Sequence, residues 1–550
     1  MIVFEIVTPI FTFILLVISI SGLGRLITHK LITCNLINVF FGFIVLGITS
    51  TFVHFFFKIT TTGNIIIFLI GIFLFIISNK KKFFKNIKKN NFYYFFILFF
   101  LLPIIISQKY HEDFGYYHLP YAISFLEEKI IFGFANVNYA YIYNSIWLNI
   151  SSLFFLSYDN FNFLTFHSFI LYSIFIIFLC KDILEEKKHT LSNIFSTLVL
   201  FYFLLKFTRI SEYGVDLPAA IYAILSIIFF LKFFEVAEEN KKNFYFFCNL
   251  SFSVFAILIK LSILPILILT FYLFFKFYFL KSFLYLKFNF LTIYICFILF
   301  FIQQFIYTGC IIFPSIASCL DVGWFNNDFA TYKNRLELIN KSYSEARSIF
   351  SPEEYLKNLN WLIFWFKRNF IELLEHILTM LIPIILYLLF LNNQIRTNKF
   401  NSQNFLILLI LFLVNLIFWL MFSPVYRFGI HFFIIFSFLI IIYFFRNKTF
   451  SKKIFLIFLC ICLSFSFSKN IKRIFMKDNF FFGIEMIKNQ HKSNEIEIID
   501  GIRILTPDIE KNMKNGWQGR LCWDIPFVCS YNKIEVSKKN KYLIFKKFND

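Results

Sequence analysis

The sequence is poor in charge for its length. Asp, Glu, Lys and Arg make up 15% of the 550 residues, whereas a soluble globular domain carries about 25%. Hydrophobic residues make up 59% of the chain and the mean hydropathy is +0.72. With only 16 glycines, a collagen-like fibre is excluded, and a chain this apolar is not disordered. These features exclude a soluble enzyme and predict a polytopic membrane protein.

Three further features are missing. The ten cysteines form no CxxC pair and no zinc-ligand spacing. The first apolar run, from Ile2, lacks a basic n-region and an A-x-A site, so we interpret it as a first span and not as a cleavable signal peptide. The net charge is +21, but the basic residues do not form a surface on which they alternate with aromatic residues. We therefore expect no nucleic-acid partner.

Apolar runs that approach the length needed to cross a hydrocarbon core of roughly 30 Å occur about fourteen times. We predict an all-α polytopic membrane protein with about 12–14 transmembrane helices over residues 1–468. A small α+β extracytoplasmic domain over 469–550 follows, with strands at Glu495–Ile499 and Tyr542–Phe545. The expected spans are roughly 3–22, 36–57, 64–78, 92–107, 161–180, 190–207, 217–234, 244–259, 262–280, 288–306, 371–391, 405–422, 428–445 and 453–468.

The lysine-rich run from Lys80 to Lys89 predicts that the loop after the third span is cytoplasmic, because Lys and Arg collect on that side. Alternation of the spans then places outer loops at 108–160 and 307–370 and puts the tail outside as well. We therefore expect a protein of the bacterial inner (plasma) membrane whose large outer segments carry its function.

The first outer loop begins with adjacent carboxylates, Glu112 and Asp113, followed by Tyr117 and His118. Carboxylates at the end of a span are costly to desolvate unless they are paired or functional. A partly desolvated carboxylate has a raised pKa, which suits it to accept a proton. The alternative is a solvated loop that begins with an acidic pair.

A short outer turn carries three more ionisable groups, Arg209, Glu212 and Asp216, before the helix-starting Pro218. Asp216 is either an N-cap of that helix or a site residue, and both roles are compatible. This turn is the second place where charge collects at the outer ends of the spans.

Two isolated cations lie at the same level. Lys260 interrupts an otherwise apolar stretch, where it either snorkels to the interface or holds a lipid phosphate. Arg427 is the only charge in roughly forty residues and lies in a tight outer turn. It is either a membrane-end anchor or a bidentate phosphate clamp.

The remaining outer segments hold aromatic and cysteine candidates. Trp324 stacks on a sugar or, as we prefer, anchors its loop at the interface. The stretch 360–367 predicts an amphipathic helix lying on the bilayer. Cys522 and Cys529 lie on either side of a proline turn. They form a disulfide in an oxidising periplasm or remain two free thiols.

The first-loop pattern E-D-x-x-x-Y-H-L-P resembles the GT-C glycosyltransferases, and most closely a bacterial multi-pass branch of them. The similarity extends from about residue 108 to near the C-terminus, through a Y-G-x-D-L-P-A stretch at Tyr213, an S-P-x-x-R-F turn at Ser423, and a C-W-D-x-P-x-x-C tail at Cys522. The stretch 139–157 resembles the interfacial helices that pack beneath the catalytic loop in this family.

The resemblance implies transfer of a hexose or pentose from a polyprenyl-phosphate carrier to a glycan, lipid or protein acceptor. Asp113 would activate the acceptor hydroxyl, and Lys260 and Arg427 would neutralise the leaving phosphate. GT-C members differ in their use of a divalent metal, and this sequence contains no recognisable set of metal ligands. A divalent metal is therefore a possible cofactor that the resemblance leaves open. Assisting or substrate-binding roles would fall to Glu112, Tyr117, His118, Arg209, Glu212, Asp216 and Trp324.

Two alternatives stay open. An O-antigen-type polymerase or ligase also has about a dozen spans and a large outer loop, but its outer loops rely on arginines, whereas this chain leads with carboxylates. A transporter would place ionisable residues or Gly/Pro breaks near the bilayer midplane in two matching halves. The charged residues here collect at the outer ends instead, which makes transport the weakest of the three readings.

Overall fold

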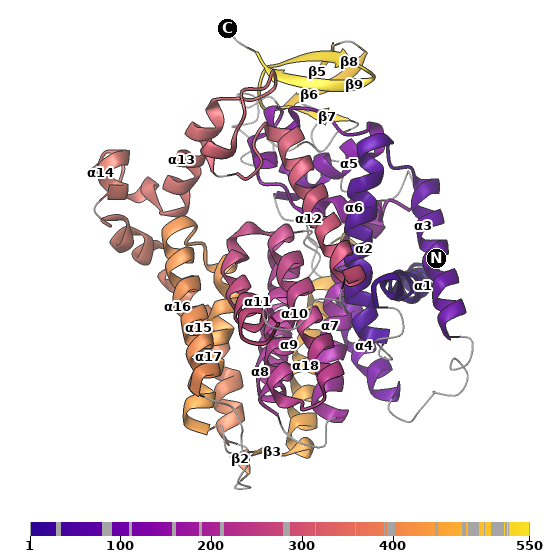
Figure 1. Cartoon of the computed structure of the whole chain (residues 1–550), viewed down its shortest axis with the longest axis vertical. Coiled ribbons are helices and arrows are strands. Elements are labelled where there is room, and N and C mark those ends of the chain that lie inside the picture. Colours follow the sequence, from indigo (N-terminus) through magenta and orange to yellow (C-terminus); the bar gives the residue numbers. More distant parts are fainter. Residues whose placement is uncertain are drawn as a thin grey trace.

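The computed structural model is a helical bundle with a small group of strands at one end (Figure 1). Most of the helices run lengthwise between this end and the opposite end, where β2 and β3 lie. The structure describes residues 2–28, 35–79, 91–108, 113–156, 161–185, 190–208, 214–278, 287–313, 315–357, 359–389, 391–392, 402–445, 449–475, 480–481, 494–499, 501–507, 522, 525 and 527–548.

Within these residues, eleven helices are long and apolar enough to cross a membrane, and three more apolar helices are shorter. Each of the predicted spans falls on one of these helices, which confirms the all-α polytopic fold. The long helices and α11 are α1 (Ile2–Thr28), α2 (Asn35–Phe56), α3 (Thr61–Asn79), α4 (Asn91–Ile106), α7 (Phe166–Glu185), α8 (Leu191–Lys206), α9 (Asp216–Glu235), α10 (Glu239–Ile259), α11 (Leu267–Leu273), α12 (Lys287–Thr308), α15 (Trp361–Leu389), α16 (Ser402–Phe422), α17 (Ile430–Phe445) and α18 (Lys452–Ile474).

These sequences form helices because a helix satisfies its own backbone hydrogen bonds, which lipid cannot do. Where helices cross closely, small residues let the backbones approach. Gly24 of α1 lies against the backbone of α2 at Asn38, and Gly22 lies against Gly71 of α3, so a side chain at either glycine would collide with backbone. The N-terminal three helices therefore pack as one unit.

Short helical segments lie between and within the apolar helices. Around them, a buried network of neutral polar groups ties the first loop to the spans: Asn149 donates to Thr51 at 2.8 Å and to Gln303 at 2.7 Å, and Tyr121 donates to Asn149 at 2.7 Å. The segments are η1 (Phe114–His118), α5 (Leu119–Glu127), η2 (Phe134–Asn136), η3 (Tyr139–Ile142), α6 (Ile146–Ser152), η4 (Phe161–Thr165), η5 (Leu261–Ile266), η6 (Phe274–Tyr278), η8 (Ile316–Ser318), α13 (Asp328–Asn340), η9 (Tyr343–Glu345), α14 (Pro352–Lys357) and η10 (Tyr426–Gly429).

The C-terminal region contains strands, as predicted. A three-stranded sheet has the order β5-β6-β7, with β6 and β7 parallel, and β8 and β9 form a separate antiparallel pair. The strands are β1 (Ser107–Gln108), β2 (Leu391–Asn392), β3 (Thr449–Phe450), β4 (Phe480–Phe481), β5 (Asn494–Ile499), β6 (Ile502–Pro507), β7 (Val528–Cys529), β8 (Ile534–Lys539) and β9 (Tyr542–Lys547).

Strand β4 from the tail pairs antiparallel with β1, which directly precedes the first outer loop. The backbone of Phe545 in β9 also exchanges hydrogen bonds with the loop, since its N–H donates to the Phe132 carbonyl at 2.8 Å. The tail is therefore docked on the segment 113–156 at the end of the bundle where α5 and α6 lie (Figure 1).

One local expectation differs from the structure. The stretch 360–367 is not a separate surface helix, because Trp361–Leu389 is one continuous helix, with its one proline at Pro383, well after this stretch. The stretch 139–157 contains short helices, and every residue of α6 is buried by other parts of the protein.

Candidate functional site

Four charged side chains from four separate segments meet at the end of the bundle that carries the tail. The Arg427 guanidinium lies 3.7 Å from the carboxylate of Asp113 and 3.3 Å from that of Asp216. The ammonium of Lys260 forms an ion pair with the other oxygen of Asp216. We call Asp113, Asp216, Lys260 and Arg427 the charged cluster.

Asp113 immediately precedes η1, a five-residue turn of π-helix. The Gly115 carbonyl accepts from the Cys522 N–H at 2.9 Å, and the Tyr116 carbonyl accepts from the Asn138 amide at 3.2 Å. The turn that carries Asp113 is thus held in place by groups from the tail and from the same outer loop.

Asp216 is the first residue of α9, and the residue before it, Val215, makes no side-chain capping bond. Its carboxylate is directed to Lys260 and Arg427. Asp216 therefore lies in the first turn of α9 and not at its N-cap position, and its role as a site residue stays a prediction. An acidic group in the first turn also suits the positive end of the helix dipole.

Lys260 lies where α10 ends and η5 begins. Its extended backbone, with φ −154° and ψ 114°, interrupts the helix. Its ammonium lies 2.9 Å from the centre of the Phe428 ring, a cation–π contact. The side chain is only 14% exposed, so this lysine is enclosed and does not reach freely into water.

Arg427 lies in η10, the turn between α16 and α17. Two buried tryptophans fix the residues that precede it: the Trp365 indole donates to the Pro424 carbonyl at 2.6 Å and the Trp419 indole donates to the Val425 carbonyl at 2.7 Å. The arginine is thus presented from a rigid turn, while its own side chain stays 41% exposed.

Enclosure changes the acidity of two groups around the cluster. Desolvation lowers the pKa of Lys260 to about 8, although the neighbouring Asp216 carboxylate opposes this shift. Burial raises the pKa of Tyr117 well above its usual value, and the carboxylates of Asp113 and Asp216 raise it further. Lys260 can therefore lose its proton not far above neutral pH, whereas Tyr117 stays protonated.

A small pocket adjoins Lys260 and Phe428. It has a cavity volume of about 20 Å³, which is room for about one water molecule. Within it, His431 and Asn415 are hydrogen-bonded at 3.2 Å, and most of the other lining side chains are aromatic. The lining residues are Ser262, Asn415, Phe418, Trp419, Phe422, Ser423, Phe428, His431 and Phe432.

The other candidate residues fall outside the cluster or outside the described residues. Glu112, Arg209 and Glu212 belong to segments that the structure does not describe. His118 is buried, and its ring packs 4.1 Å from that of Tyr117, directly beside the Asp113 turn. Trp324 packs on Phe132 and Phe305, with ring centres 5.0 and 6.0 Å away, and has no recorded contact with the cluster in the described part of the chain.

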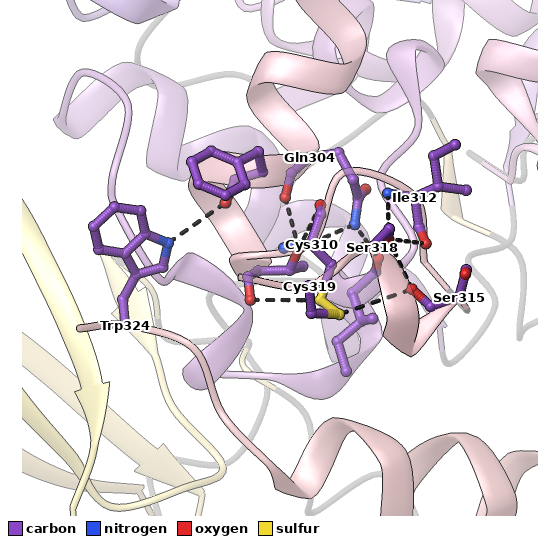
Figure 2. The surroundings of a disulfide bond; sticks show 10 residues. Gln304, Cys310, Ile312, Ser315, Ser318, Cys319 and Trp324 are labelled. Carbon is purple, nitrogen blue, oxygen red and sulfur yellow. Dashed lines mark hydrogen bonds between the residues drawn. A yellow bond between two sulfur atoms is a disulfide. The ribbon is translucent and has the colours of Figure 1, made fainter. Parts of the chain in front are cut away.

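Two disulfides lie among the described residues of the loops and the tail. Cys522 is bonded to Cys529, which is one of the two states expected for this pair. Cys310 is bonded to Cys319, a bond the sequence analysis missed, although two cysteines nine residues apart in one outer loop were a usable signal. Figure 2 shows this second disulfide closing a small loop that Ser318 braces through bonds to Ile312 and Ser315.

Phe428 was also missed as a site residue. It directly follows Arg427 in the S-P-x-x-R-F turn, but its contact with Lys260 depends on the packing of two segments 168 positions apart (428 − 260).

The cluster's own cations supply positive charge between its carboxylates. In the described part of the chain, no group of three or more His, Cys, Asp or Glu residues is placed to hold a metal ion. Asp113 and Asp216 instead share Arg427.

The fold and this cluster define a polytopic protein of the lipid bilayer with a charged site at one end of its helices. The chain belongs to the family described as a domain of unknown function, DUF8201, whose model matches residues 6–434. That range includes all four residues of the charged cluster. We find no match among curated proteins and none among solved structures. The comparisons show no glycosyltransferase family.

Proposed function

We propose that the chain is an integral membrane glycosyltransferase that uses a polyprenyl-phosphate-linked sugar at the outer face of a bacterial plasma membrane. Its product would be a modified cell-surface glycan or lipid. The observation that carries this proposal is the convergence of Asp113, Asp216, Lys260 and Arg427 at one end of the bundle. Charged side chains at the end of spans are costly, and four of them together favour function over chance.

The two cations would bind the phosphate of the donor. When the bond between the anomeric carbon and the phosphate oxygen breaks, its electron pair leaves with the phosphate, which gains negative charge. Lys260 and Arg427 are close enough to share Asp216, so both can stabilise that charge. The Phe428 ring packs against the Lys260 ammonium.

The two carboxylates would divide their roles. Asp216 pairs with both cations and so positions them. Asp113 makes the looser contact with Arg427, at 3.7 Å, and suits the role of general base. It would take the proton of the acceptor hydroxyl as the oxygen attacks the anomeric carbon.

The aromatic pocket beside Lys260 supports a lipid-linked donor. Its walls come from η5, α16, η10 and α17, which are elements of the apolar bundle. The pocket itself is too small for a prenyl chain, but its aromatic side chains would offer apolar contacts to the part of the chain next to a phosphate held at Lys260.

A transfer assay with the purified chain in nanodiscs tests the proposal. Radiolabelled polyprenyl-phosphate sugars are supplied to the wild type, to Asp113→Asn and to Arg427→Ala. We expect sugar release or transfer to fall by about 10²-fold or more in each variant, as for loss of a catalytic base or an oxyanion-stabilising group.

Arg368→Ala is the matched control, because Arg368 is an exposed arginine near the same end that hydrogen-bonds Ser344. It should retain wild-type activity. A wild type that is inert with every donor, or cluster variants that match it, would remove the basis of the transferase proposal and favour a polymerase or ligase.

A further inference from the structure

A group of half-buried tyrosines lies beside Asp113 on the side of the outer loops. Tyr116 and Tyr117 belong to η1, Tyr139 begins η3, and Tyr332 lies on α13. The rings of Tyr116 and Tyr117 are 5.8 Å apart, and those of Tyr139 and Tyr332 are 5.2 Å apart. We call these four side chains the tyrosine face.

Two observations join the two pairs into one surface. The Asn138 amide, next to Tyr139, donates to the Tyr116 carbonyl at 3.2 Å. Burial raises the pKa of Tyr332, and the nearby Tyr116 hydroxyl raises it further. Because Tyr332 packs on Tyr139, which follows Asn138, α13 lies beside the segment that bonds to η1.

The tyrosine face retains hydrogen-bonding capacity. The hydroxyls of Tyr117 and Tyr332 have no hydrogen-bond partner among the residues that the structure describes, whereas the Tyr139 hydroxyl donates to Asp328 at 3.1 Å. Arg335 lies one turn along α13 from Tyr332 and is exposed. Its positive charge lowers the pKa of Tyr116 and of Tyr332, against the larger effect of burial. The face thus combines flat apolar rings with polar groups at their edges.

We propose that the tyrosine face binds the acceptor through a sugar ring, so that the acceptor is a glycan or the sugar headgroup of a lipid. The transfer step itself rests on the proposed function above. A sugar ring has an apolar C–H surface and a rim of hydroxyls, which match the faces and hydroxyl edges of tyrosines. Tyrosines also provide this contact at low conformational-entropy cost.

The position of the tyrosine face relative to Asp113 and Arg427 suits an acceptor-binding surface. Phe428, which follows Arg427, lines the aromatic pocket, whereas Tyr117 belongs to the tyrosine face and lies close to Asp113. The contact between Asp113 and Arg427 therefore lies between the two surfaces. A sugar held on the tyrosine face would present a hydroxyl to the Asp113 carboxylate.

Binding of soluble oligosaccharides tests the proposal without any reaction. Short linear oligosaccharides of hexoses and N-acetylhexosamines are titrated against the full chain in nanodiscs, and saturation-transfer NMR reports binding. We expect the wild type to bind at least one of them, and Tyr332→Ala to bind it roughly tenfold more weakly. Tyr332→Phe, which keeps the ring, should lose about threefold at most.

Tyr443→Ala is the matched control, because Tyr443 is an exposed tyrosine near the opposite end of α17. It should bind like the wild type, and all three variants should bind a short-chain polyprenyl phosphate equally well. The proposal is overturned if no oligosaccharide binds the wild type at millimolar concentration or if Tyr332→Ala binds as the wild type does. Tyr332-dependent binding of a Ser/Thr-containing peptide in place of any oligosaccharide would assign a protein acceptor instead.

The two proposals fail separately. If the chain binds polyprenyl phosphate through Lys260 and Arg427 but no sugar, the acceptor assignment alone is wrong. If it binds sugar through Tyr332 but the Asp113→Asn and Arg427→Ala variants release donor sugar like the wild type, the transferase proposal is wrong and the sugar site remains.

Discussion

At the residue scale, the central feature is how unequally the two cations of the cluster are exposed. Lys260 is enclosed by Asp216 and Phe428, with 14% of its side chain exposed, whereas Arg427 is 41% exposed. An arginine keeps its charge in any environment, while a lysine loses it readily on desolvation. The charge available to a bound phosphate therefore depends on pH through Lys260.

This predicts a pH-dependent affinity for phosphate. The pKa of Lys260 is lowered to about 8, so its ammonium is charged below that pH and neutral above it, while a phosphate monoester is already a dianion above about pH 6. The affinity for a short-chain polyprenyl phosphate should fall by about tenfold between about pH 7 and pH 9.5, the loss of one charge-assisted hydrogen bond.

Lys260→Arg provides the control for this titration. Because the guanidinium stays charged, the variant should bind the same polyprenyl phosphate with little dependence on pH over that range. An equal fall in affinity for wild type and variant would show that another group controls binding.

At the scale of single elements, the tail supports the turn that carries Asp113. The Cys522 N–H bonds the Gly115 carbonyl in η1 at 2.9 Å, and the ring of Tyr531, just after the disulfide, lies 4.9 Å from that of Tyr116. The disulfide between Cys522 and Cys529 thus closes a loop whose first residue contacts the candidate site.

Removal of this disulfide should loosen η1. Closing so short a loop stabilises by about 2–3 kcal/mol in the chain-entropy model, so Cys522→Ser/Cys529→Ser should lower the stability of the tail by a similar amount. Hydrogen exchange at the amides of Phe114–His118 should then accelerate. Cys460→Ser, at an exposed free cysteine, should leave this exchange unchanged, and unchanged exchange in the double variant would contradict the supporting role.

The four residues of the charged cluster could be predicted from the sequence, but their contacts could not. Asp113, Asp216, Lys260 and Arg427 were recognisable because each stands next to an apolar run, where a charge is costly. Their partners were not recognisable, because the contact of Lys260 with Phe428 arises only from the packing of distant segments. Composition and periodicity predict single helices, and they do not predict which residues of distant segments come into contact.

The same limit applies to the outer loops. The position of Tyr332 over Tyr139 depends on how α13 folds back across the first loop, 193 positions away (332 − 139). The pairing of Cys310 with Cys319 is local and was within reach of sequence reasoning.

At the scale of the whole molecule, the lysine-based orientation and the structure agree on which segments share an end. Alternation of the spans predicted that the residues of the cluster all lie outside, and the structure brings them together beside the C-terminal strands. The connection between α9 and α10 must lie at the other end, since Asp216 starts α9 at the cluster.

Labelling in intact cells tests this orientation. Single cysteines at Glu353 of α14 and Lys538 of β8 should react with a membrane-impermeant maleimide added from outside. A cysteine at Lys241, an exposed residue near the start of α10, should react only after lysis. A Cys460→Ser background removes the exposed free thiol of the described residues, and Cys34 is replaced by Ser as well. The reverse labelling pattern would invert the orientation.

The most direct test of the account is the structure of the wild-type chain in a nanodisc with a short-chain polyprenyl phosphate bound. We expect the phosphate to lie within hydrogen-bond distance of both the Lys260 ammonium and the Arg427 guanidinium, with its chain packed against Phe428 and Phe432. A phosphate bound away from these two cations, or none at saturating ligand, would contradict it.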